Sequence, residues 1–381
     1  MIEDEVRAVS VDREFIGIGQ KVKEQSQRMG VYSLFYLSRA IINLKLKDID
    51  ITVVSNCVNN VTGQEERINP ENASFFGIGN VIEHESPEIR CRCIDIDAST
   101  RAEDIIPKLY ADGLYTAAYR NGQRYIQEFG QKDIESEADT GFSLKSDGAY
   151  IITGGTGGIG LETAKFLASK RRINLVLLSQ SGMPAREKWN QILLEGKDSG
   201  ACKRINAINE IEYNGTTVTC FSVDIAKYDE VNAVFKTVRS RFGKINGIIH
   251  GAGVANNELM ASQKEKDFSG VLFPKVFGTW ILDKLTESGN LDFFCLLSSI
   301  ATIFSSSGQG DYAAANAYLD SFAAFRKKQG KRTLTINWST WRDAGMAADN
   351  GVNIDTICKA IDTETAMKGF EKALEKDVIL I

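Results

Sequence analysis

The chain has 381 residues, a length that allows roughly two or three domains. Hydrophobic residues make up 43% of it and charged residues 25%, which is typical of folded globular proteins and excludes wholesale disorder. Because 45 Lys and Arg stand against 50 Asp and Glu, the formal net charge is −5, and no basic surplus exists to hold a phosphate backbone. We therefore expect no nucleic-acid partner.

Membrane, disulfide and metal-dependent classes are disfavoured as well. No apolar run approaches the ~20 residues that span a bilayer, and residues 1–5 are acidic where a signal peptide is basic and then apolar. The seven cysteines are scattered and odd in number, as in a protein with reduced thiols, so we expect a cytoplasmic protein without a membrane partner. His84 and His250 have no CxxC companions, so we expect no metal site and no Ser-His-Asp chemistry.

In the first part of the chain, helical and strand patterns alternate. The segment up to about Val31 is polar and is either a lead-in from an upstream region or a surface helix. The patterns that follow predict a helix over 32–44, strands over 51–54 and 89–95, and a helix over 99–110. A polar stretch over 130–148 then marks a domain boundary. We place the two domains at 1–146 and 147–381.

A clearer α/β alternation begins at Ala149. Segments that are mostly continuously apolar predict strands over 149–152, 174–178, 217–221, 247–250, 292–297, 333–336 and 378–380, with a helix over 160–170. Seven such segments at helix-sized intervals indicate an α/β fold with one doubly wound parallel sheet that is covered on both faces.

A glycine-rich turn follows the first of these strands. Its residues are Thr153, Gly154, Gly155, Thr156, Gly157, Gly158, Ile159 and Gly160. Glycines let the backbone approach a pyrophosphate closely, and the N-terminus of the following helix attracts its charge. A flexible turn is the alternative, but five glycines in eight residues between a strand and a helix favour a complete dinucleotide site.

The end of the second strand normally selects between NAD and NADP. An acidic residue there would bond a ribose 2′-hydroxyl, and a basic one would pair with a 2′-phosphate. The tip reads Ser179-Gln180-Ser181, which has neither, although hydroxyls and an amide could hold a phosphate. Arg186 lies further on, and its reach is open at this point. The preference for NADPH over NADH therefore stays open.

The second half carries the motifs of a known family. Asp224 follows a strand, His250-Gly251-Ala252-Gly253 ends another, and Ser299 stands thirteen residues before Tyr312. This set resembles the short-chain dehydrogenase/reductases. That superfamily usually has a Lys four residues after the Tyr, whereas here Asn316 takes that place and Lys275 lies 37 residues before the Tyr.

The exchange of Lys and Asn resembles the ketoreductase domains of modular polyketide synthases, as do segments 308–320 and 337–341. Segments 68–73 and 118–122 are similar to the structural subdomain of ketoreductases from bacterial assembly lines whose acyltransferase is a separate protein. The resemblance covers about residues 32–381.

The resemblance implies two Rossmann-like subdomains, of which the first is structural, lacks a glycine-rich turn and binds no cofactor. The second would bind NADPH, with Asp224, Ile225, Gly251, Ala252 and Gly253 added to the turn and the strand tip. The substrate would be a 3-oxoacyl or 2-oxoacyl thioester on the phosphopantetheine arm of an acyl carrier protein. Neighbouring synthase domains would be further partners. We expect a monomer excised from a larger polypeptide.

Elementary chemistry gives each catalytic candidate a role. A free Tyr has a pKa of ~10, and bringing it to 7 takes about 4 kcal/mol. A Lys275 ammonium ~4 Å from Tyr312 would supply about that much at an effective dielectric constant of ~20. Tyr312 would then be the proton donor, Ser299 would hold the substrate oxygen, and Asn316 would, by analogy with the family, order a water that relays protons.

Two fingerprints of product stereochemistry differ from the family pattern. Ala255-Asn256-Asn257 stands where Leu-Asp-Asp is expected, and the loss of the aspartate favours the L-hydroxyl product. Phe304 stands where some members have Trp. We interpret His250 as structural and Trp338 as a packing residue, and Trp341 is open between packing and nicotinamide contact.

Two other hypotheses for the function of the whole chain are a non-catalytic structural module and a free-standing reductase of small ketones.

Overall fold

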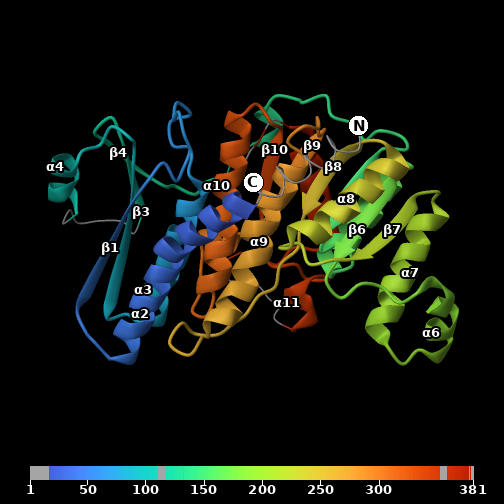
Figure 1. Ribbon diagram of the computed structural model, residues 1–381, viewed down its shortest axis with the longest axis horizontal. Helices are drawn as coiled ribbons and strands as arrows, with labels where there is room; N and C mark the ends of the chain where they lie inside the picture. The colour runs from blue at the N-terminus through green and yellow to red at the C-terminus, as the bar shows by residue number, and fades with distance from the viewer. Residues whose placement is uncertain (1–16, 110–115, 132, 352–357, 377, 379–381) are drawn as a thin grey trace, which may run out of the picture.

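Two separate β-sheets organise the chain, as the computed structural model shows (Figure 1). It describes residues 17–109, 116–131, 133–351, 358–376 and 378. The first sheet stands at the left of Figure 1 and the second at the right, with helices between them. The α/β class and the Rossmann-like architecture predicted from sequence are confirmed.

The first sheet has four strands in the order β1-β2-β3-β4. They are β1 (Ile49–Asn56), β2 (Ile89–Ile96), β3 (Thr116–Arg120) and β4 (Gln123–Ile126). The first three run parallel, and β3 and β4 form an antiparallel hairpin. Asn121 and Gly122 both have positive φ in the two-residue turn of that hairpin, as tight hairpins require. Strands β1 and β2 were predicted from the sequence, and the hairpin was not.

Most helical segments in the part of the chain before β5 are short. Residues 17–27 are helical and lead into η1 (Arg28–Tyr32) and α2 (Ser33–Asn43); the other helical segments are η2 (Pro70–Asn72), α3 (Ala73–Glu85), α4 (Ala102–Ile105), η3 (Ile106–Lys108) and η4 (Ile134–Ser136). The continuous helix predicted over 99–110 is wrong. Pro107 cannot donate the backbone hydrogen bond that would continue the α-helix, so the α-helix ends at Ile105 and a 3₁₀ turn follows. Tyr110 lies outside the described residues.

The second sheet has six strands, all parallel, in the order β10-β9-β8-β5-β6-β7. They are β5 (Ala149–Thr153), β6 (Asn174–Ser179), β7 (Thr217–Ser222), β8 (Ile245–His250), β9 (Phe293–Ser299) and β10 (Thr333–Trp338). These confirm six of the seven predicted strands. Of the seventh, Val378 lies outside any strand, and Ile379 and Leu380 lie outside the described residues. The strand order reverses between β5 and β8, where doubly wound sheets bind their ligands.

Helices cover both faces of the second sheet. They are α5 (Gly158–Lys170), η5 (Arg186–Lys188), α6 (Trp189–Glu195), α7 (Ser199–Tyr213), α8 (Tyr228–Phe242), α9 (Glu265–Leu285), η6 (Ile300–Thr302), α10 (Gly310–Lys328), α11 (Met346–Asp349) and α12 (Thr363–Glu375). Apolar residues of α5, α7 and α12 pack with one face of the strands. Those of α8, α9 and α10 pack with the other. This double cover explains why most of the strands are continuously apolar.

The two sheets share a hydrophobic core. Phe35 of α2 and Ile78 of α3 belong to the same buried cluster as Ala314 and Tyr318 of α10. Helices α2, α3, α9 and α10 accordingly lie between the sheets in Figure 1. At Gly77 of α3 a Cβ would lie 2.4 Å from the carbonyl oxygen of Ala313, so the two backbones meet without an intervening side chain. The helix that carries Tyr312 is therefore held by both subdomains.

No described helix combines the length and apolar composition that a membrane crossing needs. The part of the chain that the structure describes holds no cluster of three or more His, Cys, Asp or Glu arranged to bind a metal ion. All seven cysteines lie in that part and are free thiols.

Candidate active site

The glycine-rich turn lies at the carboxyl end of β5, beside the reversal of strand order. Gly154 has φ of +68°, a conformation that glycine adopts readily. A Cβ on Gly160 would lie 2.3 Å from the carbonyl oxygen of Gly154, so the backbone of α5 begins tightly against the turn. Gly157 precedes the first turn of α5, which carries no acidic side chain. The cradle fits the pyrophosphate of a dinucleotide, because a larger side chain would fill it and the helix N-terminus faces it.

The tip of β6 carries two hydroxyls and an amide but no Lys or Arg. The buried Oγ of Ser179 has no hydrogen-bond partner among the described residues, while Gln180 and Ser181 are exposed. The hydroxyl of Ser222 donates to the carbonyl oxygen of Gln180 at 2.9 Å and holds the tip against the end of β7. These groups fit a ribose. Because none of them is charged, only neutral hydrogen bonds are available here to distinguish a 2′-hydroxyl from a 2′-phosphate.

Arg186, whose reach the sequence left open, is engaged elsewhere. Its guanidinium donates to both carboxylate oxygens of Glu212 at 2.6 and 2.7 Å and lies over the ring of Trp189. It also donates to the carbonyl oxygen of Val218. In this arrangement Arg186 joins β7, α6 and α7.

Asp224 and Ile225 follow β7. The carboxylate of Asp224 accepts a hydrogen bond from the backbone N–H of Ala226 at 3.0 Å and so shapes the turn before α8. Ile225 is buried, and its side chain packs at Gly278 of α9. Of the two, only Asp224 offers a polar side chain at this edge.

His250 ends β8 inside the protein. Its Nδ1 lies 2.6 Å from Oγ1 of Thr153, and the same hydroxyl accepts the N–H of Ala252 at 3.1 Å. Burial and, secondarily, the charge of Lys275 lower the pKa of His250 to about 3, so the ring is neutral. The ring therefore ties the end of β8 to the glycine-rich turn, which agrees with a structural part.

A cavity of about 500 Å³ joins the cofactor side to the catalytic candidates. Of the residues predicted from sequence, it is lined by Ile159, Gly160, Gly251, Gly253, Lys275, Ser299 and Tyr312. Phe304, Trp338 and Trp341 also line it. Three segments far apart in sequence, at β8, α9 and the β9–α10 connection, thus meet at one site. Thr153 to Gly158, the tip of β6, Asp224, Ile225, Ala252 and Asn316 do not line it.

Tyr312 stands in the first turn of α10, and Asn316 lies one turn further along. The side-chain amide of Asn316 donates to the carbonyl oxygen of Tyr312 at 2.8 Å, and its buried Oδ1 has no partner among the described residues. The Oγ of Ser299, at the end of β9, accepts the N–H of Ala301 at 3.2 Å. Burial raises the pKa of Tyr312, and hydrogen bonding by Ser299 and Asn316 opposes this rise.

Lys275 reaches the cavity from α9. Its amine donates to the carbonyl oxygen of Leu297 at 3.0 Å, and a Cβ on Gly253 would lie 2.9 Å from its Cε. Burial lowers the pKa of Lys275 to about 8, while the charge of Asp320 raises it. The amine is therefore protonated at neutral pH and lines the same cavity as Tyr312.

Asp320 is a residue of this site that was not predicted from the sequence. Its carboxylate accepts hydrogen bonds from Thr335 at 3.1 Å and from the amide of Asn337 at 2.8 Å. That amide lies 3.3 Å from the carbonyl oxygen of Ser299, so Asp320 supports the turn that carries this serine. Tyr312, Asn316 and Asp320 are spaced i, i+4, i+8 on one face of α10, and this spacing was the available signal.

The two tryptophans pack on each other edge to face, with ring centroids 5.2 Å apart. Trp341 is buried and Trp338 is half-buried, and neither indole N–H has a partner among the described residues. Both rings wall the cavity, so packing and ligand contact are compatible for each.

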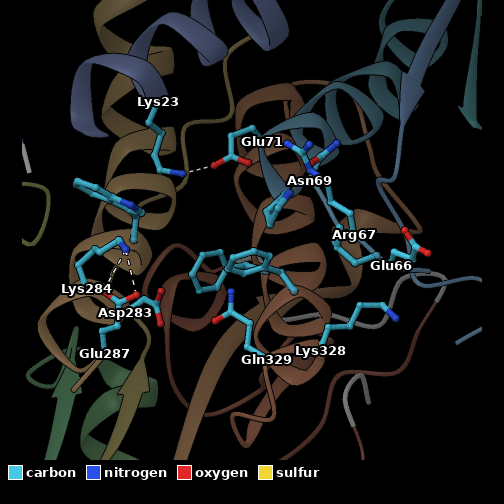
Figure 2. A pocket seen from close by; sticks show the side chains of 15 residues that line it. Lys23, Glu66, Arg67, Asn69, Glu71, Asp283, Lys284, Glu287, Lys328 and Gln329 are labelled. Carbon is cyan, nitrogen blue, oxygen red and sulfur yellow. Dashed lines mark hydrogen bonds and ion pairs between the residues drawn. The ribbon is translucent and has the colours of Figure 1, made fainter. Parts of the chain in front are cut away.

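A second cavity, of about 400 Å³, lies toward the other end of α10 (Figure 2). Figure 2 shows charged side chains around it, and two pairs of them bind each other. Lys23 binds Glu71, and Lys284 binds Glu287. None of the predicted site residues lines this cavity.

Solved structures place the fold among ketoreductases. The chain superposes on a ketoreductase from the macrolactin assembly line with a TM-score of 0.73 and 25% identity, covering 92% of this chain and 67% of that one. It also superposes on a structure with adenylation, ketoreductase and pseudo Asub domains from a keto acid-selecting NRPS module. There the TM-score is 0.81 and the identity 25%, over 94% of this chain and 30% of that one.

Sequence comparisons define the family. Residues 148–343, about half of the chain, match the KR domain, and the chain belongs to this family. Residues 11–112 match a family described as beta-ketoacyl synthase-like, N-terminal. The chain is 40% identical over 207 residues to one component of the phenolphthiocerol/phthiocerol polyketide synthase of Mycobacterium tuberculosis (strain CDC 1551 / Oshkosh). That match covers 54% of this chain and only 11% of that relative.

Proposed function

We propose that this chain is the ketoreductase of a polyketide synthase, of the bacterial type with a separate acyltransferase. It reduces a 3-oxoacyl or 2-oxoacyl thioester on an acyl carrier protein to the hydroxyacyl thioester, with NADPH as the cofactor. The observation that carries the proposal is the cavity that borders α5 on one side and holds Tyr312, Ser299 and Lys275 on the other. An oxidoreductase needs this adjacency between a nicotinamide and a proton donor.

The residues divide the work of reducing a carbonyl group. A bound nicotinamide would supply the hydride to the carbonyl carbon. The phenol of Tyr312 donates its proton to the carbonyl oxygen, where negative charge develops. The hydroxyl of Ser299 donates a hydrogen bond to the same oxygen and stabilises that charge. The product leaves as the alcohol.

Lys275 and Asn316 make the phenol a usable donor. In the structure the amine of Lys275 donates to Leu297, and burial keeps the pKa of Tyr312 above its ordinary value. Closer approach of the ammonium to the phenol, once substrate and cofactor fill the cavity, would stabilise the phenolate left after proton transfer. The free Oδ1 of Asn316 can accept a hydrogen bond from a water that carries protons toward Lys275.

The proposal extends to the residues that bind the cofactor and to the stereochemistry of the product. Thr153 to Gly160 cradle the pyrophosphate, Ser179, Gln180 and Ser181 hold the ribose and its 2′-phosphate by neutral bonds, and Asp224, Ile225 and Gly251 to Gly253 line the remaining path. The absence of Leu-Asp-Asp at 255–257 favours the L-hydroxyl product.

The synthase context rests on the relatives. The domain would be a monomer of two subdomains, 1–146 and 147–381, that works in the cytoplasm beside other synthase domains. The keto acid-selecting module among the similar structures is the reason to retain a 2-oxoacyl substrate beside the 3-oxoacyl one.

Turnover tests this proposal directly. The purified chain is given NADPH or NADH with a decalone, and then with 3-oxoacyl and 2-oxoacyl thioesters on a carrier protein. The proposal expects oxidation of NADPH, faster with the carrier-bound thioesters, and an L-hydroxyl product by chiral chromatography. A folded protein that oxidises no cofactor would be a structural module. Equal rates on free and carrier-bound ketones would indicate a free-standing reductase.

A further inference from the structure

The last turn of α3, in the first subdomain, reaches two loops of the second. Glu85 ends this helix, and its carboxylate accepts the backbone N–H of Met260 at 2.7 Å and that of Gly308 at 3.0 Å. Met260 lies in the connection between β8 and α9, and Gly308 in the connection between β9 and α10. One side chain therefore joins two loops of the other subdomain.

Both loops form walls of the cavity that holds Tyr312. Ala255 and Asn257 line it from the first loop, and Phe304, Ser306, Ser307 and Gln309 line it from the second. Gly308 has φ of +80°, and a Cβ there would lie 3.1 Å from the carbonyl oxygen of Asn257. The loops thus touch at the point where Glu85 binds them, so a shift of either changes the cavity wall.

Other groups of α3 bind the second loop at its two ends. Asn80 donates from its side chain to the carbonyl oxygen of Thr302 at 2.9 Å and accepts at its own carbonyl oxygen from the hydroxyl of Ser305 at 3.1 Å. The hydroxyl of Ser307 donates to the carbonyl oxygen of His84 at 2.8 Å. Glu85 adds the bond that continues across to the first loop.

A second carboxylate repeats this connection from within α10. The buried Asp311, directly before Tyr312, accepts the side-chain amide of Gln263 at 2.6 Å and the N–H of Tyr312 at 2.6 Å. The β8–α9 loop is thus joined through Glu85 to the β9–α10 connection at Met260, and directly to the start of α10 at Gln263. Asp311 lies within the catalytic helix itself, whereas Glu85 comes from the subdomain that carries none of the catalytic candidates.

A carboxylate suits this position better than an amide. An ionised carboxylate accepts two N–H groups with strong, charge-assisted bonds, while the amide of a glutamine has one acceptor oxygen and presents hydrogens to the second N–H. Glutamine at position 85 would keep the size of the side chain and lose one of the two loop contacts.

We propose that Glu85 is a substrate-positioning residue, through which the first subdomain fixes the two loops that shape the ketone side of the cavity. This inference rests on the proposed ketone reduction. It assigns the first subdomain a part in substrate binding while leaving cofactor binding and proton transfer to the second.

The test compares Glu85→Gln with Glu83→Gln, an exposed glutamate on the same last turn of α3. Steady-state rates with NADPH and a decalone give kcat and KM, and fluorescence titration gives the dissociation constant of NADPH. For Glu85→Gln we expect KM for the ketone to rise about tenfold, the effect of losing one hydrogen bond to a charged group. We expect kcat and NADPH affinity to match those of Glu83→Gln, because substrate binding alone is weakened.

The outcomes separate this inference from the proposed function. A wild-type chain that reduces no ketone contradicts the proposed function. If the wild type is active and the two variants have equal KM, the role proposed for Glu85 is wrong. It is also wrong if Glu85→Gln lowers kcat and NADPH affinity as much as it raises KM, because that would indicate a general structural role. Amide hydrogen exchange on the wild type does not depend on any variant folding. Slow exchange at Met260 and Gly308 supports the proposal, and unprotected exchange there contradicts it.

Discussion

The two sheets begin alike and end differently. In each, the first two strands are parallel neighbours, β1 with β2 and β5 with β6. Beyond β5 the backbone turns through glycines into α5, next to the cavity that holds Tyr312. Beyond β1 the chain enters a loop whose polar groups are bound by charged side chains of the same sheet.

Those side chains form a buried ion-pair network. Asp95 of β2 is fully buried and accepts the N–H groups of Val58 and Asn59, each at 2.9 Å. Arg120 of β3 donates to Asp95 at 2.6 Å and to Glu65 at 3.1 Å. Burial favours the neutral form of Glu65, but backbone hydrogen bonds and the one from Arg120 outweigh it and lower the pKa of Glu65 to about 2.

The two sheets satisfy the hydrogen-bonding groups at their carboxyl ends in different ways. Backbone N–H groups of the connecting loops gather there and need partners. In the first sheet the chain supplies carboxylates of its own, and in the second it leaves small residues beside a cavity. The first sheet therefore binds its own loops at this edge, whereas the second leaves a cavity beside it.

The largest effect is expected for Tyr312→Phe, which removes the proposed proton donor. Ketone reduction should fall about 10²- to 10⁴-fold, the usual contribution of a general acid, while NADPH binding stays as in the wild type. Tyr318→Phe is the matched control, since Tyr318 lies on the same helix but packs in the core that the two subdomains share. NADPH oxidation and fluorescence titration measure the two quantities. Reduction at the wild-type rate by Tyr312→Phe would assign the proton to another group.

Arg120→Ala tests the ion-pair network of the first sheet. It would leave Asp95 and Glu65 buried without their cation, which typically costs about 3–5 kcal/mol of unfolding free energy. Urea denaturation measures this loss, with the exposed Arg124→Ala of β4 as the control at about 0.5 kcal/mol or less. Folded Arg120→Ala should still bind NADPH with unchanged affinity. Equal stability of the two variants would show that the network is dispensable.

Most strands of the second sheet were predicted from the sequence because strands covered on both faces are largely apolar. The glycine-rich turn and the spacing of Ser299, Tyr312 and Asn316 were equally readable, since each motif is local. Lys275 was predicted from its family position, and the structure brings it to the same cavity.

The features that the sequence did not predict depend on contacts between distant segments. The 99–110 prediction failed because the effect of Pro107 was not weighed. Asp320, the ion pairs of Arg120 and the loop contacts of Glu85 have partners 15 or more positions away along the chain, and no local motif marks such pairs.

Gly77→Ala tests the contact between the two regions. The added Cβ would meet the backbone of Ala313, which cannot swing aside as a side chain can, so α3 and α10 must separate. Overpacking of this kind costs about 1–3 kcal/mol. Gly270→Ala in α9 is the control, because nothing lies within 4 Å of its Cβ and alanine should stabilise that helix by up to about 1 kcal/mol. Thermal unfolding separates the two. A Gly77→Ala protein as stable as the wild type would mean that the helices are held less closely than the structure shows.

The smallest effect is expected for Asp320→Asn, and its sign follows from the pKa of Lys275. Burial lowers this pKa to about 8 and the charge of Asp320 opposes the fall, so removing that charge moves the pKa further down. If the ammonium supports proton donation, kcat falls as pH rises through this pKa, and the fall begins at lower pH in the variant. At pH 8 we expect kcat to be roughly three- to tenfold lower than in the wild type, with little change at pH 6, where both amines are protonated. A pH profile from 5.5 to 9 measures this. A uniform loss at every pH would make Asp320 a support of the Ser299 turn alone, because only the electrostatic contribution shifts the alkaline limb.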